Sequence, residues 1–556
     1  MRNFLLTFTL LAAGCAQVAT QPDLAVISVI GTNDVHGELV AQDDRGGMTT
    51  FSGYINAVRL ARAKDGGLLL VDAGDMWQGT LESNLNEGYS VVEAYNAMGY
   101  AAAAIGNHEF DFGPLGPKPI PDSEGDNPTG ALQARATMAS FPLLAANLVD
   151  ASTGEMVEWD NVQPSVVVQR AGVLIGVIGV LTESTRATTI AANVRDIRIA
   201  PLAAAIEEHA DKLRGAGASL IVVVAHAGSR CTEFDDPYDT SSCRMDGEIM
   251  QVAQALPPGL VDHIVAGHVH QGIAHDVNGI AVTSSYSNTR AFSRVDFTVD
   301  RRSGEVVDRR IYPPQRIVAG ATYEGREVVP DAEVVAIAER AADMAEKRRA
   351  EPLGVTLDAP VSHRTRPESP LGNLMTDAVL QTHDADISIH NVWGGIRAEL
   401  PEGELTYGDV FRMFPFDNRV AVIELTGAEV RSIIARQAHN RNRAAGFSGM
   451  RVYVSCDVNE MQVRMLRTDG AEITDDEVLR VVVNDFLLLG GDDILTPVIP
   501  EAGFPIPNGT PLVRDTLVRW FRSNPGVMSP ADFVDADALR WNLPEELPAE
   551  CRLPGS

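Results

Sequence analysis

The chain has 556 residues, of which 45% are hydrophobic and 22% charged. This is the composition of an ordinary globular protein with at least two domains. The formal net charge is −30, from 75 acidic and 45 basic residues, which argues against a nucleic-acid partner and against electrostatic binding to an anionic membrane. An anionic substrate would therefore need a local cationic feature, such as metal ions or a few arginines.

The amino terminus has the pattern of an export signal. A basic start at Arg2 precedes an apolar run over residues 4–13, too short to span a membrane as a mature helix. Small residues before Cys15 resemble a bacterial lipobox, so residues 1–15 are interpreted as a lipoprotein signal peptide with Cys15 as the lipidation site. An ordinary secretory signal is the alternative. We expect an exported protein, periplasmic and held to a bacterial outer membrane only through a lipid on Cys15, with no further transmembrane segment.

Four cysteines remain once Cys15 is set aside, an even number suited to an oxidising compartment. Cys231 and Cys243 bracket one short polar loop, and Cys456 and Cys551 both lie in the last hundred residues. We predict the disulfides Cys231–Cys243 and Cys456–Cys551. A zinc site built from cysteines is less favoured, because no Cys-x-x-Cys pair occurs.

Apolar runs that predict buried strands alternate with amphipathic stretches that predict helices. Strands are expected at residues 24–30, 68–71, 100–105, 142–147, 219–224 and 261–266, with a hairpin at 166–168 and 173–180 and further strands over 280–320. Helices are expected at residues 51–64, 131–140, 203–215 and 247–255. Residues 113–130 are rich in Pro, Gly and Asp and predict an exposed loop. This alternation indicates a layered α/β domain.

Polar side chains follow five of these expected strands directly. They are Asp34 and His36, then Asp75, then Asn107, His108 and Asp111, then His226, and last His268 and His270. Asp34 and His36 are two residues apart, so along an extended segment they would point the same way. One loop histidine is usually structural, but five of the twelve histidines fall on these loops. Because sites in α/β domains gather at strand ends, we expect these side chains to meet.

Ligands of His, Asp and Asn type, without cysteine, suit divalent metals such as zinc, manganese or iron. There are enough of them for two ions, with Asp75 as the natural bridging carboxylate. Two metals about 3.5–4 Å apart can hold a phosphoryl group and activate water at neutral pH. His108, oriented by Asp111, can stabilise the developing charge or protonate the leaving group.

A charged helical stretch at residues 328–351 is interpreted as a connector to a second domain. That domain has no strand-end histidine cluster. Its loops carry glycines, arginines and aromatic rings, which suit an anionic ligand with a flat ring. The residues concerned are Arg364, Arg366, Asn391, Gly395, Arg397, Phe416, Asn418, Phe486 and Asp492.

The strand-end motifs, in this order and spacing, resemble those of the dinuclear metallophosphoesterases. With the loops of the second domain, the mature chain resembles the 5′-nucleotidase / UDP-sugar hydrolase family. The resemblance implies an α/β fold: a four-layer metallophosphoesterase β-sandwich flanked by helices, plus a second α+β substrate-binding domain. The implied boundaries are residues 24–325 for the catalytic domain, 326–351 for the connector helix and 352–556 for the substrate-binding domain.

The resemblance also implies a role for each site residue. One divalent metal ion would be held by Asp34, His36, Asp75 and His270, and a second by Asp75, Asn107, His226 and His268, with His108 and Asp111 as the catalytic pair. Phe416 and Phe486 would enclose the nucleobase, Asn418 and Asp492 would bond base or ribose, and Arg397 with Arg364 or Arg366 would hold phosphate. The implied activity is hydrolysis of nucleoside phosphates to nucleoside and phosphate, by a monomer or weak dimer.

Two positions depart from the family pattern. Val392 stands where the family usually has Asn, with Asn391 shifted by one, and Pro367 is an extra residue beside the arginine pair. Both touch the phosphate and ribose contacts. Nucleotide sugars, 2′,3′-cyclic nucleotides and sulfur esters therefore stay open as substrates, and a non-catalytic binding protein with the same fold stays open as an alternative.

Overall fold

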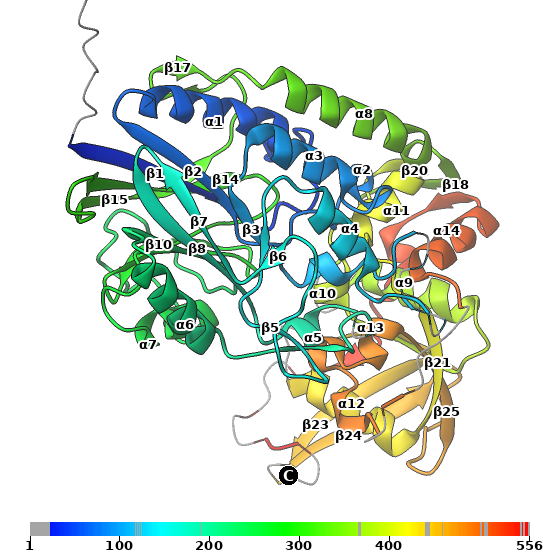
Figure 1. The fold of residues 1–556 in the computed structure, drawn as a ribbon. Coiled ribbons are helices and arrows are strands. Elements are labelled where there is room, and N and C mark those ends of the chain that lie inside the picture. The colour runs from blue at the N-terminus through cyan, green and yellow to red at the C-terminus, as the bar shows by residue number, and fades with distance from the viewer. Residues whose placement is uncertain are drawn as a thin grey trace, which may run out of the picture.

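The computed structural model describes residues 23–553, except 117, 119, 122, 124, 191, 365–367, 440–444, 459, 501–502, 505–509, 545–547 and 549–550. Cys15, Arg366 and Pro367 therefore lie outside the described residues. The amino-terminal half contains two large sheets with helices outside them, and the carboxyl-terminal half contains smaller sheets (Figure 1). Within the described residues, no helix is long and apolar enough to cross a membrane.

The first large sheet has seven strands in the order β15-β14-β1-β2-β3-β4-β6. Their bounds are β1 (Leu24–Thr32), β2 (Gly66–Asp72), β3 (Ala102–Ala104), β4 (Leu143–Leu144), β6 (Val162–Gln163), β14 (Ala291–Asp300) and β15 (Val306–Arg316). The second has six strands in the order β12-β13-β11-β10-β8-β7. Their bounds are β7 (Ser165–Arg170), β8 (Val173–Leu181), β10 (Leu220–His226), β11 (His263–Ala266), β12 (Gly272–Val277) and β13 (Ile280–Ser285). Small pairs add β5 (Leu148–Asp150) with β9 (Ile197–Ile199), and β16 (Thr322–Tyr323) with β17 (Arg326–Glu327).

The central strands β1, β8, β10 and β11 are buried on both faces, which is why the sequence shows continuous apolar runs there. Val29 of β1 and Val224 of β10 belong to one core between the two sheets, whereas Ile30 belongs to the core under the first group of helices. Those helices include α1 (Gly47–Arg62), α3 (Tyr89–Met98), α4 (Gly130–Met138) and α8 (Ala332–Arg349), and α6 (Leu202–Gly215) and α7 (Glu248–Ala255) cover the other sheet. The predicted four-layer α/β architecture is confirmed.

The expected helices at residues 51–64, 203–215 and 247–255 correspond to α1, α6 and α7. Helix α3 was not expected; it is bounded by Gly88 and Gly99, both in the left-handed region at φ 81° and 70°. The 113–130 segment is less exposed than expected, because Ile120 is buried against Ile190 and Ala192. The short helices α2 (Leu81–Asn84) and α5 (Thr185–Thr188) complete this half.

Helix α8 runs from the first half of the chain to the second (Figure 1). Its amino end is capped by Asp331, whose side chain accepts a hydrogen bond from the Glu333 N–H, and its last turn is basic. Ile337 belongs to the core beneath the seven-stranded sheet, whereas Ala345 belongs to a core of the second half. One rigid element thus packs into both halves.

The second half has three small sheets, ordered β20-β18-β26, β21-β25-β19-β22 and β24-β23-β27. Their bounds are β18 (Pro352–Leu357), β19 (Ile387–His390), β20 (Gly403–Thr406), β21 (Val420–Thr426), β22 (Gly446–Ser448), β23 (Met450–Asp457), β24 (Glu460–Arg467), β25 (Val478–Asn484), β26 (Gly526–Met528) and β27 (Trp541–Asn542). The helices are α9 (Pro370–Gln381), α10 (Val392–Gly395), α11 (Tyr407–Met413), α12 (Gly427–His439), α13 (Asp485–Leu488) and α14 (Val513–Ser523). This mixture matches the expected α+β organisation.

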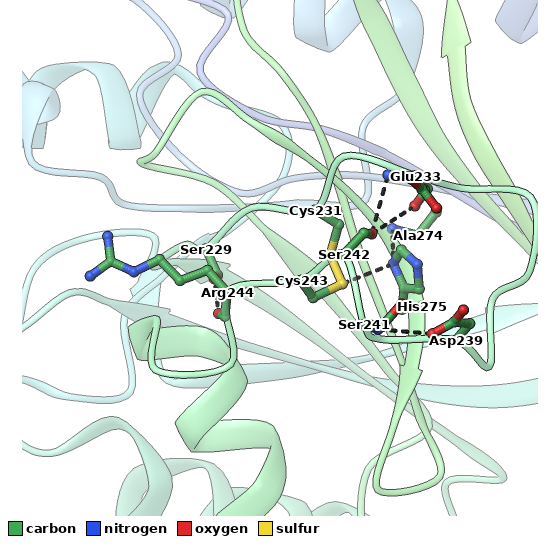
Figure 2. Close-up of a disulfide and its surroundings, with 10 residues drawn as sticks. All are labelled: Ser229, Cys231, Glu233, Asp239, Ser241, Ser242, Cys243, Arg244, Ala274 and His275. Carbon is green, nitrogen blue, oxygen red and sulfur yellow. Dashed lines mark hydrogen bonds between the residues drawn. A yellow bond between two sulfur atoms is a disulfide. The ribbon is translucent and has the colours of Figure 1, made fainter.

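Both predicted disulfides are present, Cys231–Cys243 and Cys456–Cys551. The first closes the loop between β10 and α7, and Figure 2 shows His275 beside it, with Nδ1 3.6 Å from Cys243 Sγ. The Cys231 N–H donates to the Gly272 carbonyl at 2.9 Å. The bridged loop is therefore tied to the segment that follows His270.

Candidate active site

The predicted metal ligands meet at one edge of the two large sheets. Strands β1, β2 and β3 are mutually parallel in one sheet, and β8, β10 and β11 in the other. Parallel strands bring their carboxyl ends to the same edge. His226 is the last residue of β10, and the other ligands lie on the loops after β1, β2, β3 and β11. The sequence therefore identified the right edge of the fold.

Five of these ligands have a left-handed backbone: Asp34 at φ 50°, His36 at 51°, Asp75 at 57°, His268 at 74° and His270 at 58°. Such values are uncommon outside glycine and cost roughly 1–3 kcal/mol each. The expectation that Asp34 and His36 share a face because their segment is extended is therefore wrong. They come together because the chain turns sharply at both residues.

The first group of ligands consists of Asp34, His36 and His270. His270 Nε2 lies 3.2 Å from Asp34 Oδ1 and 3.1 Å from His36 Nε2. Although burial favours the neutral acid, His270 lowers the pKa of Asp34 to about 2. A carboxylate and two imidazole nitrogens thus converge on one point.

The second group consists of Asp75, His226 and His268, joined by Asn107. His226 Nε2 lies 3.1 Å from Asp75 Oδ2 and 2.9 Å from Asn107 Oδ1, and His268 Nδ1 lies 3.0 Å from the same Asn107 oxygen. Burial opposes ionisation of Asp75, but His226 and His108 hold its pKa well below the usual range. All four residues predicted for the second metal therefore meet.

The histidines are prepared for metal binding by their surroundings. His36 Nδ1 lies 2.8 Å from the Gln78 carbonyl and His226 Nδ1 lies 2.9 Å from the Ala73 carbonyl. A carbonyl at this distance takes the Nδ1 proton and directs Nε2 toward the metal position. Burial disfavours the imidazolium of His226, but Asp75 raises its pKa to about 10, so this ring would release a proton on binding a metal. Burial lowers the pKa of His36 to about 3 and that of His268 to about 4, so both stay neutral, the form that binds metal. This donor set fits two divalent ions of the zinc or manganese type.

Glu109 is a site residue that the sequence analysis missed. Its carboxylate accepts three backbone N–H bonds, from Asp75 at 2.8 Å, Met76 at 2.8 Å and Gly106 at 2.6 Å. Burial and the nearby Asp75 raise the pKa of Glu109 to about 8 in spite of these donors. A Cβ on Gly106 would lie 2.2 Å from Asp75 Oδ1, so only glycine permits this close approach. Glu109 thus fixes the Asp75 loop against the Asn107 loop.

His108 and Asp111 are paired as predicted. His108 Nδ1 lies 2.6 Å from Asp111 Oδ2, and the other Asp111 oxygen accepts a bond of 2.7 Å from the Thr189 hydroxyl. Burial disfavours the imidazolium, but Asp111 and Asp75 together raise the pKa of His108. The backbone N–H of His108 also donates to Asp75 Oδ1 at 2.9 Å. His108 is therefore held beside the second metal group and is suited to carry a proton.

A cavity of about 320 Å³ lies between the second half of the chain and the loops after β1, β2, β3 and β11 that carry the predicted metal ligands. We call these the metal loops. From the first half the cavity is lined by Asp75, Asn107, His108, Asp111, His268 and His270, and from the second half by Asn391, Gly395, Arg397, Phe416, Asn418, Phe486 and Asp492. The Phe416 ring stacks over His108 with centroids 6.1 Å apart, and the Arg397 guanidinium lies 5.0 Å from the Phe416 centroid. Seven of the nine residues predicted to bind substrate thus lie around this one cavity, which we call the ring cavity.

Several of these polar groups bond to one another. Asn391 donates to Asp492 at 2.6 Å, and Asn418 donates to Asp485 at 3.1 Å. Asp492 has a left-handed backbone, φ 52°. A Cβ placed on Gly394 would lie 2.3 Å from Asp492 Oδ2, so the carboxylate packs directly against this glycine. These bonds fix the positions of both amides at the cavity.

Arg364 does not line this cavity. It lies, exposed, on a second groove beside Trp393, and its Nε donates to His363 Nε2 at 3.3 Å. Whether Arg366 is the second phosphate-binding arginine stays a prediction, because that residue lies outside the described chain.

Comparison with known proteins agrees with this arrangement. The family described as "5'-nucleotidase, C-terminal domain" matches residues 349–498. Cell wall protein Lmo0130 of Listeria monocytogenes is 30% identical over 540 residues, covering 87% of this chain and 67% of its own, and a 5′-nucleotidase of Vibrio cholerae is 25% identical over 587 residues, covering 97% and 94%. The crystal structure of a 5′-nucleotidase precursor from Thermus thermophilus has a TM-score of 0.70 at 23% identity, covering 94% of this chain and 100% of its own. By its sequence, and with a fold that agrees, the chain belongs to the 5′-nucleotidase family of phosphoric ester hydrolases.

Proposed function

We propose that the protein is an exported, metal-dependent 5′-nucleotidase that hydrolyses nucleoside 5′-phosphates to nucleoside and phosphate. The observation that carries this proposal is the single cavity on which the two metal groups, His108 and the rings of Phe416 and Phe486 all border. A phosphoryl group at the metal loops and a base at the rings fit one nucleotide.

In this proposal, one ion is held by Asp34, His36, Asp75 and His270, and the other by Asp75, Asn107, His226 and His268. When bound, the ions supply activation of water and compensation of the phosphoryl charge. The protein keeps both carboxylates ionised and the imidazoles His36 and His268 neutral, as the directions of their pKa shifts require. Glu109 bonds to the loop that carries Asp75 and to the start of the loop that carries Asn107, and so fixes their relative positions.

His108 acts as the proton donor. Water adds its oxygen to phosphorus, the P–O bond to the nucleoside breaks, and the His108 proton passes to the departing 5′-oxygen. Asp111 orients the ring through Nδ1 and helps to keep His108 protonated near neutral pH. One water proton stays on the released phosphate and the other returns to His108, so atoms and charge balance.

Phe416 and Phe486 would enclose the base, and Arg397, beside Phe416, would contact the phosphate. Asn418, Asp492 and Asn391 would bond base or ribose. Residues 24–325 are proposed as the catalytic domain and 352–556 as the substrate-binding domain, with 326–351 as connector. Export, periplasmic location, a lipid on Cys15 and a monomeric or weakly dimeric state remain part of the proposal.

The test is phosphate release from AMP, ADP, ATP, UDP-glucose and a 2′,3′-cyclic nucleotide. The protein is stripped with chelator and then given zinc, manganese or cobalt. Metal-restored release of nucleoside and phosphate from 5′-nucleotides is the expected result. Cleavage of UDP-glucose, the cyclic nucleotide or a sulfur ester in preference to AMP would contradict the assignment of substrate and leave the metal chemistry in place. Binding of nucleotide without any metal-restored release would contradict catalysis itself.

A further inference from the structure

The segment that follows β8, residues 182–190, lies against the loop after β3. The Thr188 carbonyl accepts a hydrogen bond from Asn107 Nδ2 at 2.9 Å, and the Thr189 hydroxyl donates to Asp111 Oδ1 at 2.7 Å. Thr188 and Thr189 also line the ring cavity. Two consecutive residues of this segment thus hold one proposed metal ligand and one member of the proposed catalytic pair.

The segment is itself anchored to the second sheet. The Thr182 N–H donates to the His226 carbonyl at 2.9 Å, and the Thr182 hydroxyl donates to Glu248 Oε2, at the start of α7, at 2.7 Å. The Thr185 hydroxyl donates to the Thr182 carbonyl at 2.7 Å, and both threonines are fully buried. Thr189, directly after α5, returns to an extended backbone at φ −135°. The position of the Thr189 hydroxyl is therefore set by residues outside the metal loops.

The two oxygens of the Asp111 carboxylate bond to different partners. One accepts from Thr189, and the other lies 2.6 Å from His108 Nδ1. The terminal torsion of an aspartate side chain has only a broad preference, so a single bond leaves the carboxylate free to turn, whereas bonds to both oxygens fix it. Asp111 is 8% exposed and Thr189 is 4% exposed, so little water reaches this contact. The orientation of the His108 ring therefore depends on Thr189 through Asp111.

The backbone of the loop after β3 has supports of its own. Asn193 Nδ2 donates to the Phe110 carbonyl at 2.8 Å, and the Glu109 carboxylate accepts from the Gly106 N–H at 2.6 Å. Neither bond involves Thr189. Loss of the Thr189 hydroxyl should therefore leave the loop in place and free only the carboxylate that orients His108.

We infer that Thr189 is a positioning residue for the proton transfer. Its hydroxyl fixes Asp111, and Asp111 fixes the His108 ring so that Nε2 faces the departing 5′-oxygen. In the step itself, the P–O bond to the nucleoside breaks and the proton passes from His108 Nε2 to that oxygen, while Thr189 keeps its own proton. This inference rests on the proposed function.

The experiment compares two variants of metal-reloaded protein. Thr189→Val has nearly the same shape and removes the donor, whereas Thr189→Ser keeps the donor. With AMP, kcat should fall about tenfold or more in Thr189→Val and stay near the wild-type value in Thr189→Ser, because only the first loses the charge-assisted bond to Asp111. KM for AMP, and metal content by elemental analysis, should change little. Thr376→Val, at a buried threonine whose hydroxyl donates within α9, is the matched control and should keep full turnover.

A second substrate separates proton donation from structural support. p-Nitrophenolate is a stable leaving group without a proton, so kcat for p-nitrophenyl phosphate should fall far less than kcat for AMP in both Thr189→Val and His108→Ala. In the His108→Ala background, Thr189→Val should lower kcat for AMP no further, because the two residues act in one chain. If Thr189→Val does not fold, Thr189→Ala, which adds no bulk, carries the same predictions.

Three results would each overturn the inference and leave the proposed function in place. They are full turnover of AMP in Thr189→Val, equal losses on AMP and p-nitrophenyl phosphate, and losses that add to those of His108→Ala. If the metal-reloaded wild-type protein releases no phosphate from AMP, the proposed function fails and the inference fails with it.

Discussion

The metal loops and the ring cavity differ in backbone geometry and in how deeply their side chains are buried. The metal loops follow parallel strands of two sheets, and five of their residues adopt left-handed backbones. Five of the seven proposed ligand side chains bond to a backbone group. The ring cavity is lined by the half-buried rings of Phe416, on a loop, and Phe486, on α13. The backbone of the metal loops is strained at five residues, whereas these two rings are only half buried.

This difference has a functional meaning. Strain of roughly 1–3 kcal/mol per residue persists only where the surrounding structure fixes it, and such fixed geometry is what metal chemistry requires. Contacts made by half-buried rings can change with little cost to the fold. We therefore expect variants of the metal loops to change turnover or metal content, and variants of the ring cavity to change substrate affinity.

The largest effect is expected for His108→Ala. Without its proton donor the enzyme should lose roughly 10²–10⁴-fold in kcat for AMP. Metal content, measured by elemental analysis, should be unchanged, because His108 is not a proposed ligand. His383→Ala, at a histidine outside the site, is the control. Full turnover in His108→Ala would show that the proton comes from elsewhere.

A smaller loss is expected for Glu109→Gln. Glu109 accepts three backbone N–H bonds with its two carboxylate oxygens. A glutamine at this position has an NH₂ group in place of one oxygen, and that group would face at least one of the three donors. Metal affinity should weaken about 10–100-fold, as for other residues that orient ligands. Metal titration of stripped protein measures this, with activity restored at high metal. Glu93→Gln, at a partly buried carboxylate on α3 that pairs with Arg340, serves as control. Unchanged metal affinity would mean that the loops hold their positions without this clamp.

Phe416→Ala tests the ring cavity. A base stacked on an aromatic ring loses about 1–3 kcal/mol on truncation to alanine. KM for AMP should therefore rise about tenfold, and kcat/KM for ribose 5-phosphate, which has no base, should change far less. Equal losses on both substrates would show that Phe416 acts on His108, over which it stacks, and not on the base.

The least effect on turnover is expected for Asp485→Asn, which tests stability. Burial raises the pKa of Asp485 from 3.8 to about 6, so the folded protein binds this proton more tightly than the unfolded chain. Wild-type stability should therefore fall as pH rises from about 4 to 6 and stay lower above that. The unfolding free energy of the variant relative to wild type should rise by about 2 kcal/mol between pH 4 and pH 8. Denaturant unfolding at both pH values measures it; a pH-independent difference would contradict the shift.

The same comparison explains what the sequence could predict. Apolar strands that end in Asp, His and Asn are local patterns, and they indicated a layered α/β domain with a site at its strand ends. The four layers and the assignment of ligands to each metal came from the family resemblance, and both disulfides came from the number and positions of the cysteines. The left-handed turns at Asp34 and His36 and the clamp by Glu109 depend on backbones of loops far apart in the chain. The place of Arg364 on the second groove depends on how the two halves pack, which no local pattern records. Helix α3, which lies between two glycines, was not predicted although its sequence is amphipathic.

The most direct test of the division between chemistry and recognition uses one metal-reloaded preparation and two substrates, AMP and ribose 5-phosphate. The result we predict is metal-dependent phosphate release from both, with kcat/KM for AMP higher by about tenfold or more through base stacking. Equal values for the two substrates would contradict the role of the ring cavity. Release that persists in full after the metals are removed would contradict the metal chemistry on which the whole assignment depends.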